Sequence, residues 1–183
     1  MQTEAQYNVL AGNDSHVSDL FLEAFEHASK MLEARAAREE ILTHLISAAE
    51  NAAGAGSVAS ILVLDKDGLL RNGASPKLPA DYLAAIDRLK PDPQIGTCAA
   101  AAATGCVVIT PDFYADDKWA ELRHLPLALG FLGAWSMPIK SADGKVLGTF
   151  GTYFRERRTP LPEEIKGIEL LASVAAQALA SSY

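Results

Sequence analysis

Two short turns with strand-like sequence on both sides place the strongest constraint on the fold of this chain. Residues 65–68 read Asp-Lys-Asp-Gly, and residues 142–144 read Ala-Asp-Gly. Turns this short join antiparallel neighbours, because a parallel pair needs a crossover of about a dozen residues or more. The sequence therefore predicts an antiparallel sheet built around two hairpins, whose strands are expected at 57–64, 69–74, 134–139 and 146–154.

Apolar residues spaced three or four positions apart predict amphipathic helices at both ends of the chain. The first stripe covers 17–32 and returns at 41–49, which fits either one long helix or two helices with a break near Ala36. The last stripe covers 165–179. Between these ends we expect three shorter helices, at 79–89, 98–103 and 119–129. We also expect one more strand at 106–110, with Cys106 in the core.

These elements together predict an α+β fold. The 183 residues are 49% hydrophobic, which is enough apolar material for a core. Helices that are apolar on one stripe must bury it against another element. We therefore expect an antiparallel sheet with helices on one face and a smaller lid of loops and short helices on the other.

Charge and composition exclude several classes of protein. The net charge of −7 argues against nucleic acid as a partner, because phosphate binding needs a basic patch. No apolar run reaches the length of a membrane span, and the N-terminus lacks the features of a signal peptide. Two cysteines and four dispersed histidines predict neither a disulfide framework nor a metal site. We expect a cytoplasmic protein with reduced thiols, no membrane partner and no cofactor.

A proline-rich loop that runs into five alanines marks the first candidate site. The alanines at 99–103 favour a helix, and Thr97 is a plausible N-cap for it. Unpaired backbone N–H groups of Thr97, Cys98 and Ala99 are one possible anion site. The alternative is that the Thr97 hydroxyl and water satisfy these groups.

Cys98 lies in the first turn of that helix and invites two interpretations. A helix N-terminus lowers the pKa of a thiol, which would suit redox sensing or nucleophilic chemistry. The alternative is a small buried residue that packs the helix onto the sheet. No histidine lies nearby in sequence and no second cysteine is placed to resolve a sulfenic acid, so packing is favoured.

Several stretches, in order and at fitting spacing, resemble a GAF domain, the bacterial small-ligand sensor module. They include the run Ile95-Gly96-Thr97-Cys98, Asp112 with Trp119, and the segments 74–79, 134–139 and 143–150. The resemblance implies a GAF domain at 38–183, an N-terminal helical extension at 1–37, and a six-stranded antiparallel sheet. It also implies a ligand held between that sheet and the lid helices. The subtype usually has Gly-Ser-Cys-Gly where this chain has Gly96-Thr97-Cys98-Ala99.

The resemblance further implies a small-ligand-sensing regulatory protein. Stand-alone GAF proteins serve as nitrate receptors, so a nitrate-like oxyanion is the guessed ligand. We find no carboxylate pair with an acid–base partner, and therefore expect no enzyme. The alternative is a thiol-based redox sensor or reductase using Cys98. The expected ligand-binding residues are Ile95, Gly96, Thr97, Cys98, Ala99, Phe113, Trp119, Trp135 and Ser136.

Two of these expectations carry alternatives of their own. The indole N–H of Trp135 is expected either to point into the pocket as a donor or to pack in the core. The stripes of the terminal helices either cover the sheet or form the interface of a homodimer, and the dimer is favoured. The signal is then expected to leave through contact with a sensor kinase or a transcription regulator.

Overall fold

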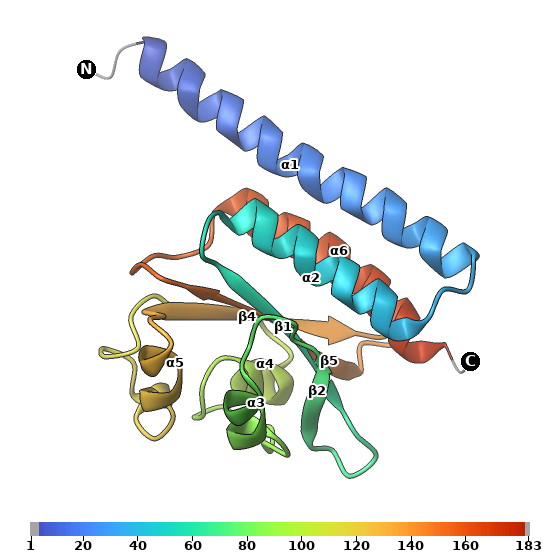
Figure 1. Ribbon diagram of the computed structural model, residues 1–183, viewed down its shortest axis with the longest axis vertical. Helices are drawn as coiled ribbons and strands as arrows, with labels where there is room; N and C mark the ends of the chain where they lie inside the picture. Colours follow the sequence, from blue (N-terminus) through green and yellow to red (C-terminus); the bar gives the residue numbers. More distant parts are fainter. Residues whose placement is uncertain (1–3, 182–183) are drawn as a thin grey trace.

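The computed structural model describes residues 4–181 and has an α+β fold (Figure 1). Its sheet has five strands in the order β2-β1-β5-β4-β3, and every neighbouring pair is antiparallel. Both predicted hairpins are present, as β1 with β2 and as β4 with β5. The strands are β1 (Val58–Leu64), β2 (Leu70–Ala74), β3 (Val108–Thr110), β4 (Gly133–Lys140) and β5 (Val146–Phe154).

The expected sixth strand is wrong for the part of the chain that the structure describes. β3 ends at Thr110, and the chain then turns at Pro111 instead of pairing along the outer edge of β3. Two aspartates hold this turning segment. Asp112 accepts a hydrogen bond from the Tyr114 N–H, and Asp116 accepts one from the Lys118 N–H. Such side-chain bonds favour turns over a strand ladder.

Three long helices form a layer over one face of the sheet (Figure 1). α2 (Arg38–Ala53) and α6 (Pro162–Ala180) lie directly on the strands, and α1 (Glu4–Glu33) lies outermost on both of them. Phe21 of α1 sits on Gly167 of α6, where a Cβ would lie only 2.0 Å from the Phe21 ring. The glycine therefore lets the two helices approach closely.

The N-terminal stripes form two helices rather than one. The Ala36 N–H bonds to the Met31 carbonyl and the Arg35 N–H bonds to the Leu32 carbonyl, which is the Schellman arrangement at a helix end. Arg35 has the left-handed backbone (φ 56°) that this motif needs. The chain thus reverses direction close to Ala36, where the break was expected.

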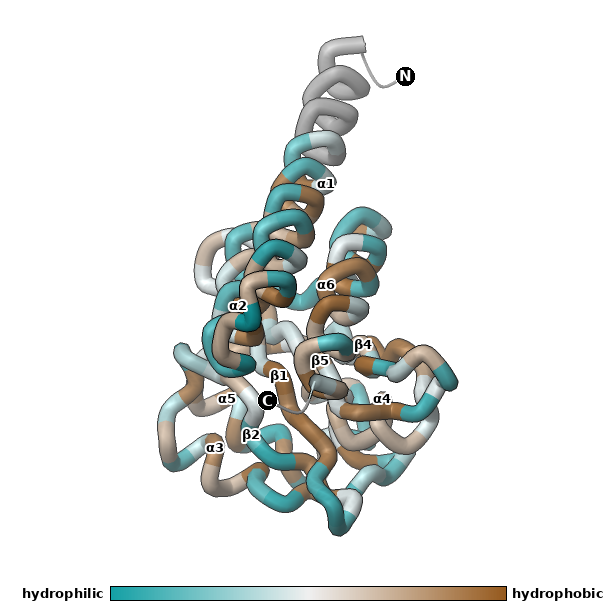
Figure 2. The backbone as a smooth tube through the Cα atoms, turned by 90° about the vertical axis from the view of Figure 1, so that its right-hand side faces the viewer, coloured by the Kyte–Doolittle hydropathy of each residue, from teal (hydrophilic) through white to brown (hydrophobic). Residues whose placement is uncertain are grey.

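Two hydrophobic clusters occupy the two faces of the sheet. Figure 2 shows hydrophobic residues concentrated along β1, between the helix layer and the lid. The helix-side cluster includes Ile61, Trp135 and Phe150, and the lid-side cluster includes Leu62, Phe113 and Tyr153. Because side chains alternate along a strand, neighbours such as Ile61 and Leu62 belong to opposite clusters.

The lid consists of short elements on the other face of the sheet. They are α3 (Ala80–Ile86), α4 (Cys98–Thr104), the 3-10 turn η1 (Asp117–Trp119) and α5 (His124–Ala128). The predicted lid helices are therefore present, and α3 and α5 are shorter than expected. One core assignment was wrong, because Cys106 is exposed in the turn that precedes β3. Gly105, with φ 65°, ends α4 there and turns the chain outward.

Candidate functional site

A buried polar cluster lies where the start of α4 meets the lid face of the sheet. Ser60 on β1 pairs with Gly151 on β5, and Gly151 pairs with Ser136 on β4. The register therefore lines these residues up across three adjacent strands. Ser60 and Ser136 are both fully buried. Small polar residues thus replace large apolar ones at the centre of this sheet face.

A chain of hydrogen bonds joins this sheet face to α4. The Ser136 hydroxyl donates to Thr97 Oγ1 over 2.9 Å, and Cys98 Sγ lies 3.1 Å from Ser136 Oγ. Since a serine has a single hydroxyl hydrogen, the Cys98 thiol is the donor in the second bond. Thr97 occupies the N-cap position, but its side chain makes no capping hydrogen bond. The expected capping role of the Thr97 hydroxyl was therefore wrong, because Ser136 binds that hydroxyl instead.

Gly151 provides the space in which this cluster sits. A Cβ at position 151 would lie 3.0 Å from Cys98 Sγ and 3.4 Å from the hydroxyl oxygens of both Ser60 and Ser136. The three polar atoms therefore converge over the glycine. The Ser60 hydroxyl is buried and has no hydrogen-bond partner in the protein. A buried hydroxyl without a partner costs about 1–3 kcal/mol, so this one is a natural contact for a bound molecule.

The Cys98 thiol is placed to remain protonated. Burial raises the pKa of Cys98, and the side-chain hydrogen bonds with Ser136, Thr149 and Thr97 offset only part of that rise. The N-terminus of α4 does not overcome this effect. Thiolate chemistry needs the opposite shift, because the thiolate and not the thiol is the nucleophile.

Two tyrosines extend the polar cluster toward α3. The Tyr82 hydroxyl of α3 donates to the Tyr153 hydroxyl of β5 over 2.8 Å, and the rings meet edge to face. Burial is the main cause that raises the pKa of both tyrosines above the usual range. Both phenols therefore stay neutral, and the site offers uncharged hydrogen-bonding groups.

Aromatic side chains of the lid cover the start of α4. The rings of Phe113 and Trp119 lie 4.4 Å apart, and the Trp119 ring packs against Gly96. The Trp119 indole N–H donates to Thr110 Oγ1, whose hydroxyl donates to Asp116 over 2.6 Å. These bonds fix the orientation of the buried Trp119 ring against Gly96, beside the start of α4.

Trp135 lies apart from the other predicted site residues. Its side chain belongs to the helix-side core, whereas Ser136, the next residue on β4, faces the lid. Of the two alternatives for the Trp135 indole, the structure shows core packing, so its inclusion among the ligand-binding residues of the lid pocket was wrong. Its indole N–H is buried without a hydrogen-bond partner.

The structure brings the remaining predicted residues together on the lid side. Thr97, Cys98 and Ser136 form the hydrogen-bonded core of the site, and Ala99 is buried behind them in α4. Ile95 packs against the same lid-side cluster. Sequence reasoning missed Ser60, Gly151, Tyr82 and Tyr153 as members of the site. Polar or small residues that alternate with large apolar ones in the predicted strands were the available signal.

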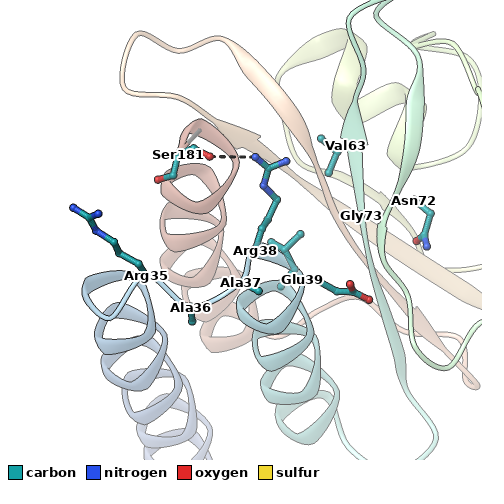
Figure 3. Close-up of a pocket in the computed structure, with 10 residues that line it drawn as sticks. Arg35, Ala36, Ala37, Arg38, Glu39, Val63, Asn72, Gly73 and Ser181 are labelled. Atoms are coloured by element: carbon teal, nitrogen blue, oxygen red, sulfur yellow. Dashed lines mark hydrogen bonds between the residues drawn. The ribbon is translucent and has the colours of Figure 1, made fainter. Parts of the chain in front are cut away.

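A groove lies on the opposite side of the sheet and is a weaker candidate. This groove of about 630 Å³ runs between the α1–α2 turn and the edge formed by Val63 and Gly73 (Figure 3). Arg38 is already engaged there, since its guanidinium donates to the Ser181 carbonyl over 3.2 Å. Arg35 points away from the groove in Figure 3. Nothing in it matches the buried polar groups around Gly151.

Among residues 15–181, no group of three or more His, Cys, Asp or Glu side chains is arranged to hold a metal ion. None of the described helices combines the length and the apolar character that crossing a membrane requires.

Comparison with known proteins relates this architecture to a family. A family model described as a GAF domain matches residues 35–180. The methyl sulfide methyltransferase-associated sensor of Methanosarcina acetivorans is 34% identical over 145 residues. The match covers 79% of this chain but spans only 14% of that relative.

Two solved structures share the fold at low sequence identity. The GAF domain of a phosphoenolpyruvate-protein phosphotransferase from Coxiella burnetii has a TM-score of 0.70 and 19% identity, covering 87% of this chain and 93% of that one. Free methionine-R-sulfoxide reductase from Neisseria meningitidis, in complex with its substrate, has a TM-score of 0.65 and 14% identity, covering 88% and 89%. Since the family model spans most of this chain, the protein belongs to the GAF domain family of signalling and ligand-sensing modules.

Proposed function

We propose that this GAF domain senses a small ligand held between the sheet and the lid, at the polar cluster around Gly151. The observation that carries the proposal is the buried Ser60 hydroxyl, which has no partner in the protein and faces Cys98 and Ser136 across the glycine. A ligand that accepts or donates hydrogen bonds there would remove the cost of this unpaired group. Phe113 and Trp119 would enclose it, as apolar walls do in most small-molecule sites.

The proposed ligand is a nitrate-like oxyanion. The cluster offers the unpaired hydroxyl of Ser60, beside the hydroxyls of Ser136 and Thr97 and a protonated thiol at Cys98, whose present hydrogen bonds would turn toward the ligand. Such uncharged donors suit a weakly basic, poorly hydrated anion better than a phosphate, which is usually bound by arginine or lysine. The expected contacts also include the backbone at Gly96 and Ala99 and the side chain of Ile95.

A thermal-shift screen against small anions and metabolites tests the proposal. A ligand that binds only the folded state raises the unfolding midpoint, by a free energy that grows with ligand concentration over Kd. We expect nitrate to raise the midpoint of the wild type. If nitrate and every other compound leave the midpoint unchanged, the proposed ligand site is wrong.

Substitution of one hydroxyl makes the test specific for the site. Ser60→Ala removes an unpaired hydroxyl, so the apo protein should lose no stability while the shift caused by nitrate disappears. Ser75→Ala is the matched control, because the Ser75 hydroxyl is also buried without a partner but lies beyond the end of β2. A nitrate shift that survives in Ser60→Ala would contradict the assignment.

Burial of Cys98 argues against the thiol-based alternative. A redox sensor or reductase would need an accessible thiolate, whereas Cys98 is buried and its pKa is raised. We expect iodoacetamide at pH 7 to modify only Cys106 in the folded protein, as read by peptide mass spectrometry. Rapid modification of Cys98 would favour the thiol-based alternative. We propose that the protein is a binding module without enzymatic activity.

We further propose a homodimer through the helix layer, with residues 38–183 as the sensor unit and 1–37 as its helical extension. Phe21, Ala24 and Ala28 of the N-terminal apolar stripe are buried within the protomer, so these side chains cannot contact a second copy. Leu22 is 52% exposed on the outer side of α1 and is the proposed contact with a second copy.

The oligomeric state of a Leu22 variant tests the dimer. Leu22→Glu should shift the mass in analytical ultracentrifugation from dimer to monomer without loss of folding, because this side chain is not part of the core. Glu26→Leu is a control at another exposed position of α1. A monomeric wild type would contradict the proposal. As output, we propose contact with a cytoplasmic sensor kinase or transcription regulator.

A further inference from the structure

Three arginines leave the end of β5 and contact three different parts of the molecule. They are Arg155, Arg157 and Arg158, and they lie in the segment that joins Phe154 to the start of α6 at Pro162. We call residues 155–158 the arginine connector. Each of its arginines makes specific contacts.

Arg157 connects to the lid. Its Nε donates to Asp112 Oδ2 over 2.7 Å, and its guanidinium lies 5.9 Å from the centre of the Tyr114 ring. The other carboxylate oxygen of Asp112 accepts the Tyr114 N–H. This ion pair therefore holds the turn that leads from β3 to Trp119, the aromatic wall of the proposed ligand site.

Arg158 connects to the helix layer. It forms a bidentate pair with Glu164 in the first turn of α6, at 2.7 and 2.8 Å, and also donates to the Ala53 carbonyl at the end of α2. Glu164 is buried and accepts the Leu161 N–H as well. A bidentate pair of this kind fixes orientation as well as distance.

Arg155 anchors the beginning of the connector. Its guanidinium donates to the Leu129 carbonyl over 2.7 Å and to the Gly56 carbonyl over 3.1 Å, and it lies over the Phe131 ring. Leu129 follows α5 in the lid, whereas Gly56 lies in the turn from α2 to β1. The connector is therefore tied to both layers at its first residue as well.

We propose that the arginine connector couples the lid to the helix layer, so that a change at the lid loop alters the first turn of α6. Arg157 and Arg158 are consecutive, so their Cα atoms are about 3.8 Å apart and a displacement of one is carried to the other. From Glu164 the path continues one turn along α6 to Gly167, on which Phe21 of α1 rests. The use of this coupling in signalling rests on the proposed ligand site, but the coupling itself is a property of the ligand-free protein.

Hydrogen exchange of the ligand-free full chain tests the coupling. Asp112→Asn removes the charge that binds Arg157 but keeps an oxygen for the Tyr114 N–H. We expect amide exchange to rise roughly twofold to fivefold in the lid loop at 111–119 and also at 162–168 in α6, a size in keeping with an exposed ion pair. Arg157→Gln should give the same pattern, and the double variant should add nothing further.

A second ion pair of matching geometry supplies the control. Arg71 Nε donates to Asp87 Oδ1, also over 2.7 Å, and both partners are partly exposed. Asp87→Asn should leave exchange at 162–168 unchanged. The proposal is overturned if α6 exchanges at the wild-type rate in both Asp112→Asn and Arg157→Gln, or if Asp87→Asn accelerates it equally. Because no ligand is used, these outcomes are independent of the nitrate screen.

Discussion

The two faces of the sheet are built from the same strands but serve different purposes. On β1, β5 and β4, the helix face carries Ile61, Phe150 and Met137, whereas the lid face carries Ser60, Gly151 and Ser136. Each large apolar residue is a direct neighbour of a small or polar one. The alternation that makes a sheet two-sided thus separates the residues that stabilise the fold from those proposed to bind a ligand.

This division predicts that substitutions on the two faces have different consequences. The helix face is packed with large side chains, so truncation there removes buried apolar area and leaves a cavity. The lid face is crowded over Gly151, where Cys98, Ser60 and Ser136 lie close to the glycine, so additions there matter more than deletions. Four experiments probe the contrast, beginning with the largest expected effect.

Trp135→Ala should lower the free energy of unfolding more than the other substitutions, because it leaves a cavity at a fully buried site on the helix face. We expect a loss on the order of 3–5 kcal/mol in urea unfolding. Trp135→Phe is the control, since it keeps most of the volume and removes an indole N–H that has no partner. The phenylalanine variant should stay within about 1.5 kcal/mol of wild type. A loss below about 1 kcal/mol for Trp135→Ala would place the side chain outside the core.

Gly167→Ala should destabilise the helix layer, although alanine is the better helix former by about 1 kcal/mol. The new Cβ would lie 2.0 Å from the Phe21 ring, so α1 must move away from α6. We expect a net loss of about 1–3 kcal/mol and faster hydrogen exchange across α1. The second substitution Phe21→Ala should cancel the penalty of Gly167→Ala, as a double-mutant cycle would show. A stabilised Gly167→Ala variant would mean that α1 does not pack here.

Gly151→Ala should have a smaller effect on stability and a specific effect on binding. Its Cβ would lie 3.0 Å from Cys98 Sγ, and we expect a loss of about 1–2 kcal/mol together with loss of the nitrate shift. Removing the sulfur with Cys98→Ala in the same chain should restore part of the stability. Full retention of both stability and binding in Gly151→Ala would show that the space over this glycine is not used.

The pH dependence of stability should arise on the helix side and be the smallest of these effects. His44 of α2 lies 4.6 Å, centre to centre, from the His27 ring of α1, in a groove that Glu23 also lines. Burial is the main cause that lowers the pKa of His44 below 6.5. As the pH falls, His44 therefore takes up a proton at a higher pH in the unfolded chain than in the folded one. The free energy of unfolding should then fall as the pH drops below about 6.5.

Urea midpoints at pH 7.5 and 5.5 measure this dependence. His44→Gln should flatten it, whereas His124→Gln, at an exposed site on α5, should keep the wild-type slope. Identical slopes in the wild type and in His44→Gln would assign the pH dependence to other groups.

Much of the fold could be predicted because its signals are local. The turns at 65–68 and 142–144 and the β-branched runs beside them identified both hairpins, and the break near Ala36 was one of two open alternatives. The sixth strand came from family expectation and not from the residues of this chain. Cys106 was misplaced because the exact start of β3 depends on Gly105, whose left-handed backbone ends α4.

The site was harder to predict because it depends on register. Ser60, Gly151 and Ser136 come from three strands far apart in sequence, and only the pairing brings them together. Strand alternation favours the core alternative for Trp135, since consecutive residues of a strand point to opposite faces and Ser136 faces the lid. Thr97 has the residue type and position of an N-cap, but its hydroxyl oxygen accepts a hydrogen bond from Ser136 of β4 instead of from a backbone N–H of α4.

The reversal at Arg35 makes the arrangement of α1 a balance between two energies. A non-glycine residue in the left-handed region costs on the order of 1–2 kcal/mol, and the flanking Ala, Arg and Glu residues would favour a continuous helix. Packing of α1 on the helix-side core opposes this cost, through buried Phe21, Ala24 and Ala28 and the partly buried side chains of Val17, Phe25, Met31 and Leu32. The position of α1 against α2 and α6 therefore depends on how much apolar area these residues bury there, set against the backbone cost at Arg35.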